Sequence, residues 1–388
     1  MKILLGLDGW YPSVDGVVGT VENYYKNLIG DNECEIVVPE FERDHKSSEG
    51  HEEGVYFTKS VKILGLDNYV CPTPRWDKHL DEKIKNGNYD ILHAHSPFMI
   101  GEFFAKEGKK YHIPTVYTFH TKFRDEFLAI TKSKILSKYL LHRIVRTISR
   151  FDYVFAVSDG AAATLKEYGY KGEIRVLRNG TDMRIPDKDT ERAYIERVNR
   201  EYGLEGVENV FLYVGRIVAV KNIPFSLNAL KILKDRGVNF KFLIVGDGAE
   251  RKHIQNIVDE TGLTDNVIFT GSILDKSLLQ ALYVRSDIYL LPSTFDNASL
   301  TILEAASGGL PAIVPKGSSV SEVIKDGRNG FIVDGGSEEW ADKIEKLIAD
   351  KDSLKIVGEN AKKEIYRSWA DVTAEMAAQY EEIINEKK

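Results

Sequence analysis

The sequence predicts an α/β protein made of two doubly wound, Rossmann-like domains in tandem. Short apolar runs alternate with helical patterns over residues 1–182, a polar stretch at 183–206 interrupts this rhythm, and the alternation restarts at residue 210. Alternating strands and helices imply a parallel sheet that is covered on both faces. The length of 388 residues also fits two domains. We therefore expect an N-terminal domain over 1–182 and a C-terminal domain over 183–365.

The expected strands of the N-terminal domain are short apolar runs: Lys2–Leu7, Glu35–Val38, Asp90–His93, Thr115–Phe119, Tyr153–Val157 and Ile174–Val176. Val17–Ile29 is expected to form a helix, and residues 40–54 a charged surface loop. Ligands of such sheets bind beyond the carboxyl ends of the strands. For a tandem pair, this predicts a site in the cleft between the domains.

The C-terminal domain repeats the pattern without repeating the sequence. Strands are expected at Val210–Val214, Phe240–Val245, Val267–Phe269, Ile288–Leu291, Ala312–Val314 and Phe331–Val333. The intervening helices are expected at Pro224–Arg236, Ala249–Thr261, Lys276–Arg285 and Ser299–Ser307, and residues 337–388 are helical throughout.

Composition narrows the function classes. Apolar residues make up 43% and charged residues 29%, as in ordinary globular proteins, and the net charge of −7 argues against a nucleic-acid partner. Residues 1–180 balance their charges, so this half is the better suited to an anionic surface. Two cysteines without metal-site spacing suit a reducing cytoplasm. No apolar run approaches the ~18 residues of a membrane span, so any membrane contact is expected to be peripheral.

The most informative stretch is residues 293–311, where seven residues separate Asp296 from Glu304. Residues that favour helix N-caps precede Leu300, so a helix that begins here would point free N–H groups at an anion. Glu304, about two turns deeper, could accept hydrogen bonds from the paired hydroxyls of a sugar. Alone, the motif fits equally well a helix cap with a buried, satisfied glutamate.

Two further loops suit a nucleotide. Gly215 and Arg216 follow a strand directly, and Lys221 comes five residues later. A guanidinium and an ammonium at a strand end suit a diphosphate, although a lone arginine and lysine are more often ordinary surface charges. Gly246 and Asp247 end the next strand in an incomplete dinucleotide motif, and Ile273 follows the strand after that, where backbone could pair with a base.

In the N-terminal domain, Gly16 precedes a helix and could bring N–H groups against a phosphate, although it could also be a simple turn glycine. His120 ends a strand and could contact a sugar hydroxyl or be an ordinary core histidine. His93 and His95 invite a metal interpretation, but we expect them to alternate faces on their strand, and no nearby ligand completes a site. The expectation is therefore no metal.

Residues 122–150 carry a net charge of +6 and show apolar residues at helical spacing. A basic amphipathic helix of this kind is a candidate for binding an anionic bilayer, although a core-packed helix with a solvated basic face is commoner. The basic residues in question are Lys122, Arg124, Lys132, Lys134, Lys138, Arg143 and Arg146.

Taken together, these motifs resemble the retaining glycosyltransferases of family four, which have the GT-B fold. The resemblance covers nearly the whole chain and adds Asn179-Gly-Thr-Asp182 and Asp326-Gly-Arg-Asn-Gly-Phe331 to the motifs above. It implies that residues 366–388 form a helix that crosses back to the N-terminal domain. It also implies a metal-independent transfer with retained anomeric configuration, in which a nucleotide sugar is the substrate and no cofactor is needed.

The resemblance implies a role for each motif residue. Arg216 and Lys221 hold the donor diphosphate, Glu304 holds the ribose hydroxyls, and His120 lies near the transferred sugar. Gly16, Gly215, Gly246, Asp247 and Ile273 shape the donor site, while Asp296 and the backbone of Asn297, Ala298, Ser299 and Leu300 hold the sugar and phosphate. The family usually has glutamate where this chain has Asp296.

Within the family, residues 118–127 and the basic segment are similar to enzymes that glycosylate diacylglycerol. This implies UDP-glucose as donor, a lipid acceptor, and a peripheral location at the inner face of the plasma membrane. A soluble or polyprenyl-linked sugar acceptor in cell-envelope polysaccharide synthesis stays open as the alternative. So do a sugar-nucleotide epimerase and a non-catalytic sugar-nucleotide sensor, and the oligomeric state is also left open.

Overall fold

The computed structural model describes residues 1–11, 16–41, 54–62, 70–120, 123–293 and 300–387. The chain forms two compact units. Unit 1 comprises Met1–Asn179 together with Trp369–Lys388, and unit 2 comprises Gly180–Ser368. The sequence placed these limits at residues 182 and 365.

Unit 1 contains a parallel sheet in the order β3-β2-β1-β6-β7-β8-β9. Its strands are β1 (Lys2–Gly6), β2 (Glu33–Pro39), β3 (Val55–Thr58), β6 (Ile91–Ala94), β7 (Thr115–Phe119), β8 (Tyr153–Ala156) and β9 (Arg175–Val176). Leu5 of β1 pairs with Ile36 on one side and with His93 on the other. The strand order therefore reverses between β1 and β6. Sheets of this type bind ligands beside such a reversal, beyond the carboxyl ends of the strands. A small antiparallel pair, β4 (Ser60–Lys62) and β5 (Val70–Pro72), adjoins this sheet.

Polar side chains cap the starts of several helices in unit 1. Asp77 accepts a hydrogen bond from Leu80 N at the start of α2, and Ser158 accepts one from Ala161 N at the start of α6. The helices are α1 (Gly16–Leu28), α2 (Lys78–Asn86), α3 (Met99–Tyr111), α4 (Phe123–Thr131), α5 (Lys134–Ile148), α6 (Asp159–Glu167) and α14 (Trp369–Lys387), with a short 3-10 turn η2 (Pro74–Trp76).

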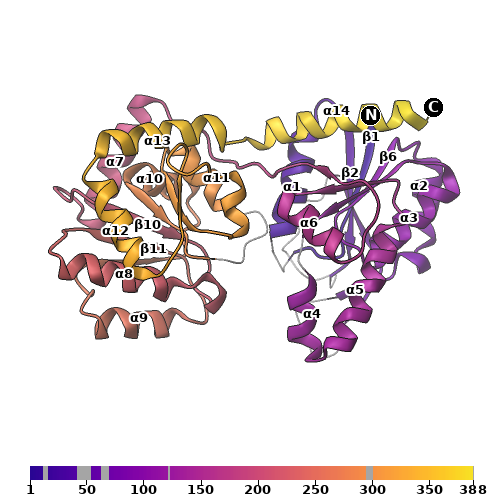
Figure 1. Cartoon of the computed structure of the whole chain (residues 1–388). Helices are drawn as coiled ribbons and strands as arrows, with labels where there is room; N and C mark the ends of the chain where they lie inside the picture. The colour runs from indigo at the N-terminus through magenta and orange to yellow at the C-terminus, as the bar shows by residue number, and fades with distance from the viewer. Residues whose placement is uncertain (12–15, 42–53, 63–69, 121–122, 294–299, 388) are drawn as a thin grey trace. The chain divides into compact units, whose positions relative to one another are not determined.

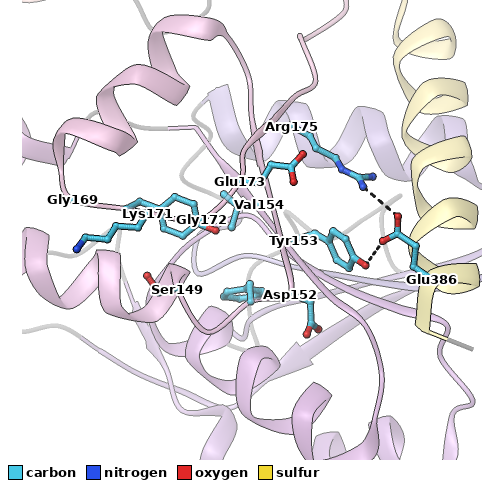
Figure 2. A pocket seen from close by; sticks show the side chains of 12 residues that line it. Ser149, Asp152, Tyr153, Val154, Gly169, Lys171, Gly172, Glu173, Arg175 and Glu386 are labelled. Atoms are coloured by element: carbon cyan, nitrogen blue, oxygen red, sulfur yellow. Dashed lines mark hydrogen bonds and ion pairs between the residues drawn. The ribbon is translucent and has the colours of Figure 1, made fainter.

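Helix α14, the C-terminal helix, packs against α1 and belongs to unit 1 (Figure 1). Its buried residues Trp369, Val372, Met376, Tyr380 and Ile383 recur at helical spacing, so one face of the helix is apolar. At its end, Glu386 accepts from Tyr153 Oη at 2.6 Å and pairs with Arg175 (Figure 2). These contacts fasten the last turns of the chain to β8 and β9.

Unit 2 has a second parallel sheet in the order β12-β11-β10-β13-β14-β15, and its strand order reverses between β10 and β13. The strands are β10 (Val210–Val214), β11 (Lys241–Val245), β12 (Val267–Gly271), β13 (Ile288–Leu290), β14 (Ala312–Pro315) and β15 (Phe331–Val333). Its helices are α7 (Lys188–Tyr202), α8 (Ile223–Asp235), α9 (Arg251–Glu260), α10 (Lys276–Arg285), α11 (Leu300–Ser307), α12 (Ser337–Ile348) and α13 (Lys351–Glu364), with 3-10 turns η3 (Ala219–Lys221) and η4 (Ser319–Val323).

Two expectations about local structure are wrong. The polar stretch 183–206, expected to interrupt the rhythm of strands and helices, contains helix α7, which packs on α10, and Arg197 pairs with Asp275 at 2.8 Å. The basic segment 122–150, expected as one helix, contains two. Lys132 has a φ of 50°, which no helix accommodates, and Ser133 then caps α5.

Candidate active site

The loops that follow β10, β11, β12 and β13 lie at one edge of the sheet of unit 2, because adjacent parallel strands share their carboxyl end. Most of the predicted donor-binding residues belong to these loops. Gly215 and Arg216 follow β10, Gly246 and Asp247 follow β11, and Ile273 follows β12. Tertiary structure therefore brings together motifs that lie far apart in the sequence.

Glycine is required where two of these loops touch. Gly246 has a φ of +127°, and a Cβ there would lie 2.0 Å from the carbonyl oxygen of Gly215. A Cβ on Gly248 would lie 2.3 Å from the carbonyl oxygen of Ile217. Any larger residue would push the loop that carries Arg216 away from its neighbour. The incomplete glycine motif thus sets the position of the cationic loop.

The two predicted cations differ in their surroundings. The Arg216 side chain is exposed and forms no ion pair with the residues that the structure describes. Lys221 is partly buried at the end of η3, beside Val220. The carbonyl oxygen of Val220 accepts from Ser293 Oγ at 3.4 Å, which places this loop next to the residue that precedes the acidic motif.

Glu304 lies on α11 and is partly buried. Its Oε2 accepts from Tyr283 Oη at 2.7 Å. Burial raises the pKa of the Glu304 carboxyl, the hydrogen bond from Tyr283 opposes that shift, Asp182 adds to it and Lys276 reduces it. Its Oε1 has no hydrogen-bond partner among the described residues. The glutamate is therefore held at one oxygen and available at the other.

The remaining donor residues are placed only in part. Asp296, Asn297, Ala298 and Ser299 lie outside the described residues. Leu300 is the first residue of α11 and is partly buried. The Asp247 side chain is exposed, with its Oδ1 accepting from Gly248 N at 2.7 Å. The partly buried Ile273 packs against the core of unit 2.

In unit 1, His120 directly follows β7 and is buried, with its Nε2 3.0 Å from Nδ1 of His95. Burial lowers the pKa of His120 to about 3, so its imidazole is neutral near pH 7. The rings of His93 and His95 lie 4.1 Å apart, so the expectation that they alternate faces is wrong. Residues i and i+2 of a strand share a face. His93 bonds to Thr118 Oγ1 at 2.7 Å and to Tyr380 of α14.

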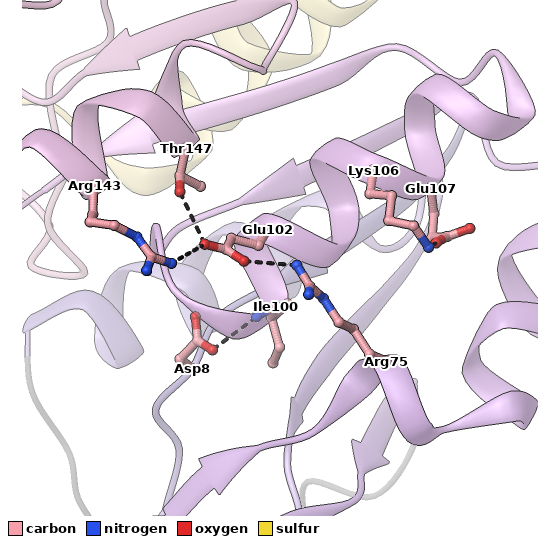
Figure 3. A network of polar contacts seen from close by, with 8 residues as sticks. All are labelled: Asp8, Arg75, Ile100, Glu102, Lys106, Glu107, Arg143 and Thr147. Atoms are coloured by element: carbon pink, nitrogen blue, oxygen red, sulfur yellow. Dashed lines mark hydrogen bonds and ion pairs between the residues drawn. The ribbon is translucent and has the colours of Figure 1, made fainter.

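The sequence analysis did not identify one carboxylate at the carboxyl edge of the unit 1 sheet. Asp8 follows β1, and its Oδ1 accepts from Ile100 N at 2.9 Å, so it caps α3 (Figure 3). Ser96 Oγ donates to its other oxygen, and burial nevertheless raises the pKa of Asp8 to about 6. Its position just after a buried strand could have identified this aspartate from the sequence. Gly16, the predicted phosphate contact of unit 1, is the exposed first residue of α1.

The two helices that replace the single predicted one project as a hairpin from unit 1 (Figure 1). Leu141, Ile144, Val145 and Ile148 of α5 are buried, so this face packs on the core. A second apolar set is exposed instead: Leu128, Ile130, Ile135, Leu136 and Tyr139. The exposed fraction reaches 78% for Ile130 and 85% for Ile135. We call this set, at the tip of the hairpin, the apolar tip.

Three of the predicted basic residues, Lys132, Lys134 and Lys138, lie within the stretch of chain that carries the apolar tip. Lys132, Lys134, Lys138 and Arg146 are exposed and form no ion pairs with the described residues, and Lys122 lies outside those residues. Arg124 pairs with Glu167 at 3.8 Å and lies over the Tyr168 ring. Arg143 pairs with Glu102 of α3, which also binds Arg75 at 2.9 Å (Figure 3). Arg143 therefore fastens the hairpin to the body of unit 1.

We also searched the described residues for a metal site, a membrane-spanning helix and a further cavity. No group of three histidine, cysteine or acidic side chains in the described ranges could hold a metal ion. No helix in the same ranges is both long enough and apolar enough to cross a bilayer. A cavity of about 610 Å³ in unit 1 is lined by Asp152, Tyr153, Arg175 and Glu386. It lies at the amino end of β8, on the opposite edge of the sheet from His120, and we do not assign it to the site.

Comparison with known protein families decides the assignment. Residues 14–184 match the model described as Glycosyltransferase Family 4, and residues 195–364 match the model described as Glycosyl transferases group 1. The chain belongs to the family-four glycosyltransferases. This glycosyltransferase is 24% identical over 355 residues to an alpha-monoglucosyldiacylglycerol synthase of Streptococcus pneumoniae, covering 91% of this chain and 79% of the relative.

Other matches show how far the likeness reaches. The glycosyltransferase is 28% identical over 329 residues to an N-acetyl-alpha-D-glucosaminyl L-malate synthase of Bacillus anthracis, covering 81% of this chain and 80% of the relative. The crystal structure of Anabaena HepE in complex with UDP superposes with a TM-score of 0.76 at 20% identity, covering 98% of this chain and all of that one. The GT-B fold predicted from the sequence is confirmed.

Proposed function

We propose that this glycosyltransferase moves glucose from UDP-glucose to a lipid acceptor such as diacylglycerol, with retention of configuration and without a metal ion. Unit 2 binds the donor and unit 1 the acceptor. One observation carries the lipid acceptor: the apolar tip is exposed to solvent, and Lys132, Lys134 and Lys138 in the same stretch form no ion pair with any residue that the structure describes. A surface of this composition suits an anionic bilayer, in which apolar side chains insert while the cations meet the head groups.

The donor half of the proposal rests on charge and hydrogen bonding in unit 2. A departing diphosphate carries negative charge, and Arg216 and Lys221 supply two positive charges on one loop after β10. In this proposal they neutralise the leaving group in the way that a divalent ion does in other enzymes. Glu304 receives the ribose hydroxyls at the oxygen that Tyr283 does not occupy.

The proposed transfer takes place on one face of the sugar. The acceptor hydroxyl attacks the anomeric carbon from the side on which the diphosphate leaves, and its proton passes to the departing phosphate oxygen. The C–O bond to phosphate breaks as the new glycosidic bond forms, so the anomeric configuration is kept. The role of His120 beside the transferred sugar stays a prediction.

A second candidate uses a soluble acceptor, because one relative is named N-acetyl-alpha-D-glucosaminyl L-malate synthase and L-malate is a small soluble hydroxy acid. Product analysis separates the two candidates. The protein is incubated with UDP-glucose and either diacylglycerol in anionic vesicles or small hydroxyl acceptors, with EDTA present, and the products are identified by mass spectrometry and NMR. Glucosyl diacylglycerol with an α linkage is expected. Transfer only to soluble acceptors, a β linkage, or loss of activity in EDTA would each refute the corresponding part of the proposal.

A further inference from the structure

A buried tyrosine hydroxyl contacts the carboxylate to which we assign the ribose. Tyr283 lies on α10, its side chain is fully buried, and its Oη donates to Oε2 of Glu304 at 2.7 Å. The ring of Tyr289 packs edge to face against that of Tyr283, with centroids 5.9 Å apart. Packing on all sides leaves the tyrosine ring little freedom, so the position of its hydroxyl is set by the core of unit 2.

This contact decides how the Glu304 carboxylate is oriented. The last torsion of a glutamate side chain is broad and nearly two-fold, so the plane of a free carboxylate rotates easily. A strong hydrogen bond from a fixed donor selects one orientation. Because Oε2 is occupied, Oε1 is the oxygen left for a ligand, and no described residue donates to it.

The same contact favours the charged form of Glu304. Burial and Asp182 raise the pKa of this carboxyl, whereas Tyr283 and Lys276 lower it. Asp182 and Lys276 pair with each other, so their opposing effects are linked. An ionised carboxylate accepts hydrogen bonds from hydroxyl groups more strongly than a neutral acid does.

We propose that Tyr283 is a positioning residue that holds the Glu304 carboxylate in the orientation that binds the ribose hydroxyls of a nucleoside diphosphate. This inference rests on the proposed donor role of Glu304. Tyr283 itself touches no ligand. It acts by selecting one carboxylate orientation before the nucleotide arrives, which removes the entropy cost of ordering that group on binding.

The test compares nucleotides with and without the ribose hydroxyls. The dissociation constants of UDP and 2′,3′-dideoxy-UDP, and of GDP and 2′,3′-dideoxy-GDP, are measured by calorimetry on the full chain. For whichever of UDP and GDP the wild type binds, its affinity is expected to exceed that for the dideoxy analogue by about tenfold or more. This ratio corresponds to the free energy of a hydrogen bond to a charged group. In Tyr283→Phe this preference is expected to fall several-fold, with the affinity for the dideoxy analogue unchanged.

Tyr289→Phe is the matched control. Its hydroxyl is also buried, but it donates to the Val214 carbonyl oxygen at 3.1 Å and contacts Thr301 Oγ1 at 2.7 Å instead of Glu304. This variant is expected to keep the wild-type preference. A preference that Tyr283→Phe also keeps would overturn the positioning role while leaving the donor site intact. Equal weakening of both nucleotides would overturn it as well, because loosened packing affects them alike. A wild type without any preference would instead refute the ribose assignment of Glu304.

Discussion

Replacing the two most exposed side chains of the apolar tip should strongly weaken membrane binding without harming the fold. Ile130 and Ile135 expose 78% and 85% of their surface, so the double change Ile130→Ser with Ile135→Ser removes almost no packing. Burying a whole isoleucine side chain is worth about 1.5–3 kcal/mol. Scaled by the exposed fractions, insertion of both into a bilayer contributes roughly 3 kcal/mol, so the variant should bind vesicles about 100-fold more weakly.

Flotation with vesicles of anionic lipid measures how strongly each variant binds the membrane, and chemical denaturation measures its unfolding free energy. Ile356→Ser is the matched control, since Ile356 is 62% exposed but lies on α13 of unit 2. The control should bind vesicles like the wild type, and all variants should unfold within about 0.5 kcal/mol of it. If the double variant floats with vesicles as well as the wild type does, the apolar tip is not the membrane-binding surface.

Three further results are expected. Lys221→Ala should lower turnover by at least about 100-fold with little change in unfolding free energy, because the leaving diphosphate loses a fixed charge; normal turnover contradicts the assignment. Tyr380→Phe should cost about 1–3 kcal/mol of stability in urea denaturation, because it leaves His93 Nδ1 buried without a partner, and a cost near zero would argue against that bond. Asp8→Asn should flatten the pH dependence of stability between pH 4 and 7. Burial raises the pKa of Asp8 from 3.8 to about 6, so ionising this carboxyl opposes folding. As the pH rises from 4 to 7, the wild type should therefore lose on the order of 3 kcal/mol more unfolding free energy than Asp8→Asn does. Equal slopes for both proteins would contradict this.

Local patterns in the sequence were sufficient for much of the fold. The strands Thr115–Phe119 and Val210–Val214 were predicted to the residue, because each is a short apolar run with buried side chains throughout. Helix α7 was missed because its apolar stripe is narrow. Val198 is its one buried residue, and Tyr194 and Tyr202, four positions to either side, pack only partly buried against the core. Polar contacts such as that of Arg197 with Asp275 also help to hold the helix in place.

For the candidate site, the sequence identified the residue types and the tertiary structure identified their partners. Glycines after strands, and cations beside them, are local signals, and they pointed to Gly215, Arg216 and Gly246 at what is one edge of a sheet. Nothing local pairs Tyr283 with Glu304, Asp8 with α3, or His93 with Tyr380 at the far end of the chain. The spacing of apolar side chains reflects the geometry of a single helix or strand, and residues close together in the sequence determine that geometry. Hydrogen bonds between elements depend on which strands and helices pack together, and only the folded core decides that.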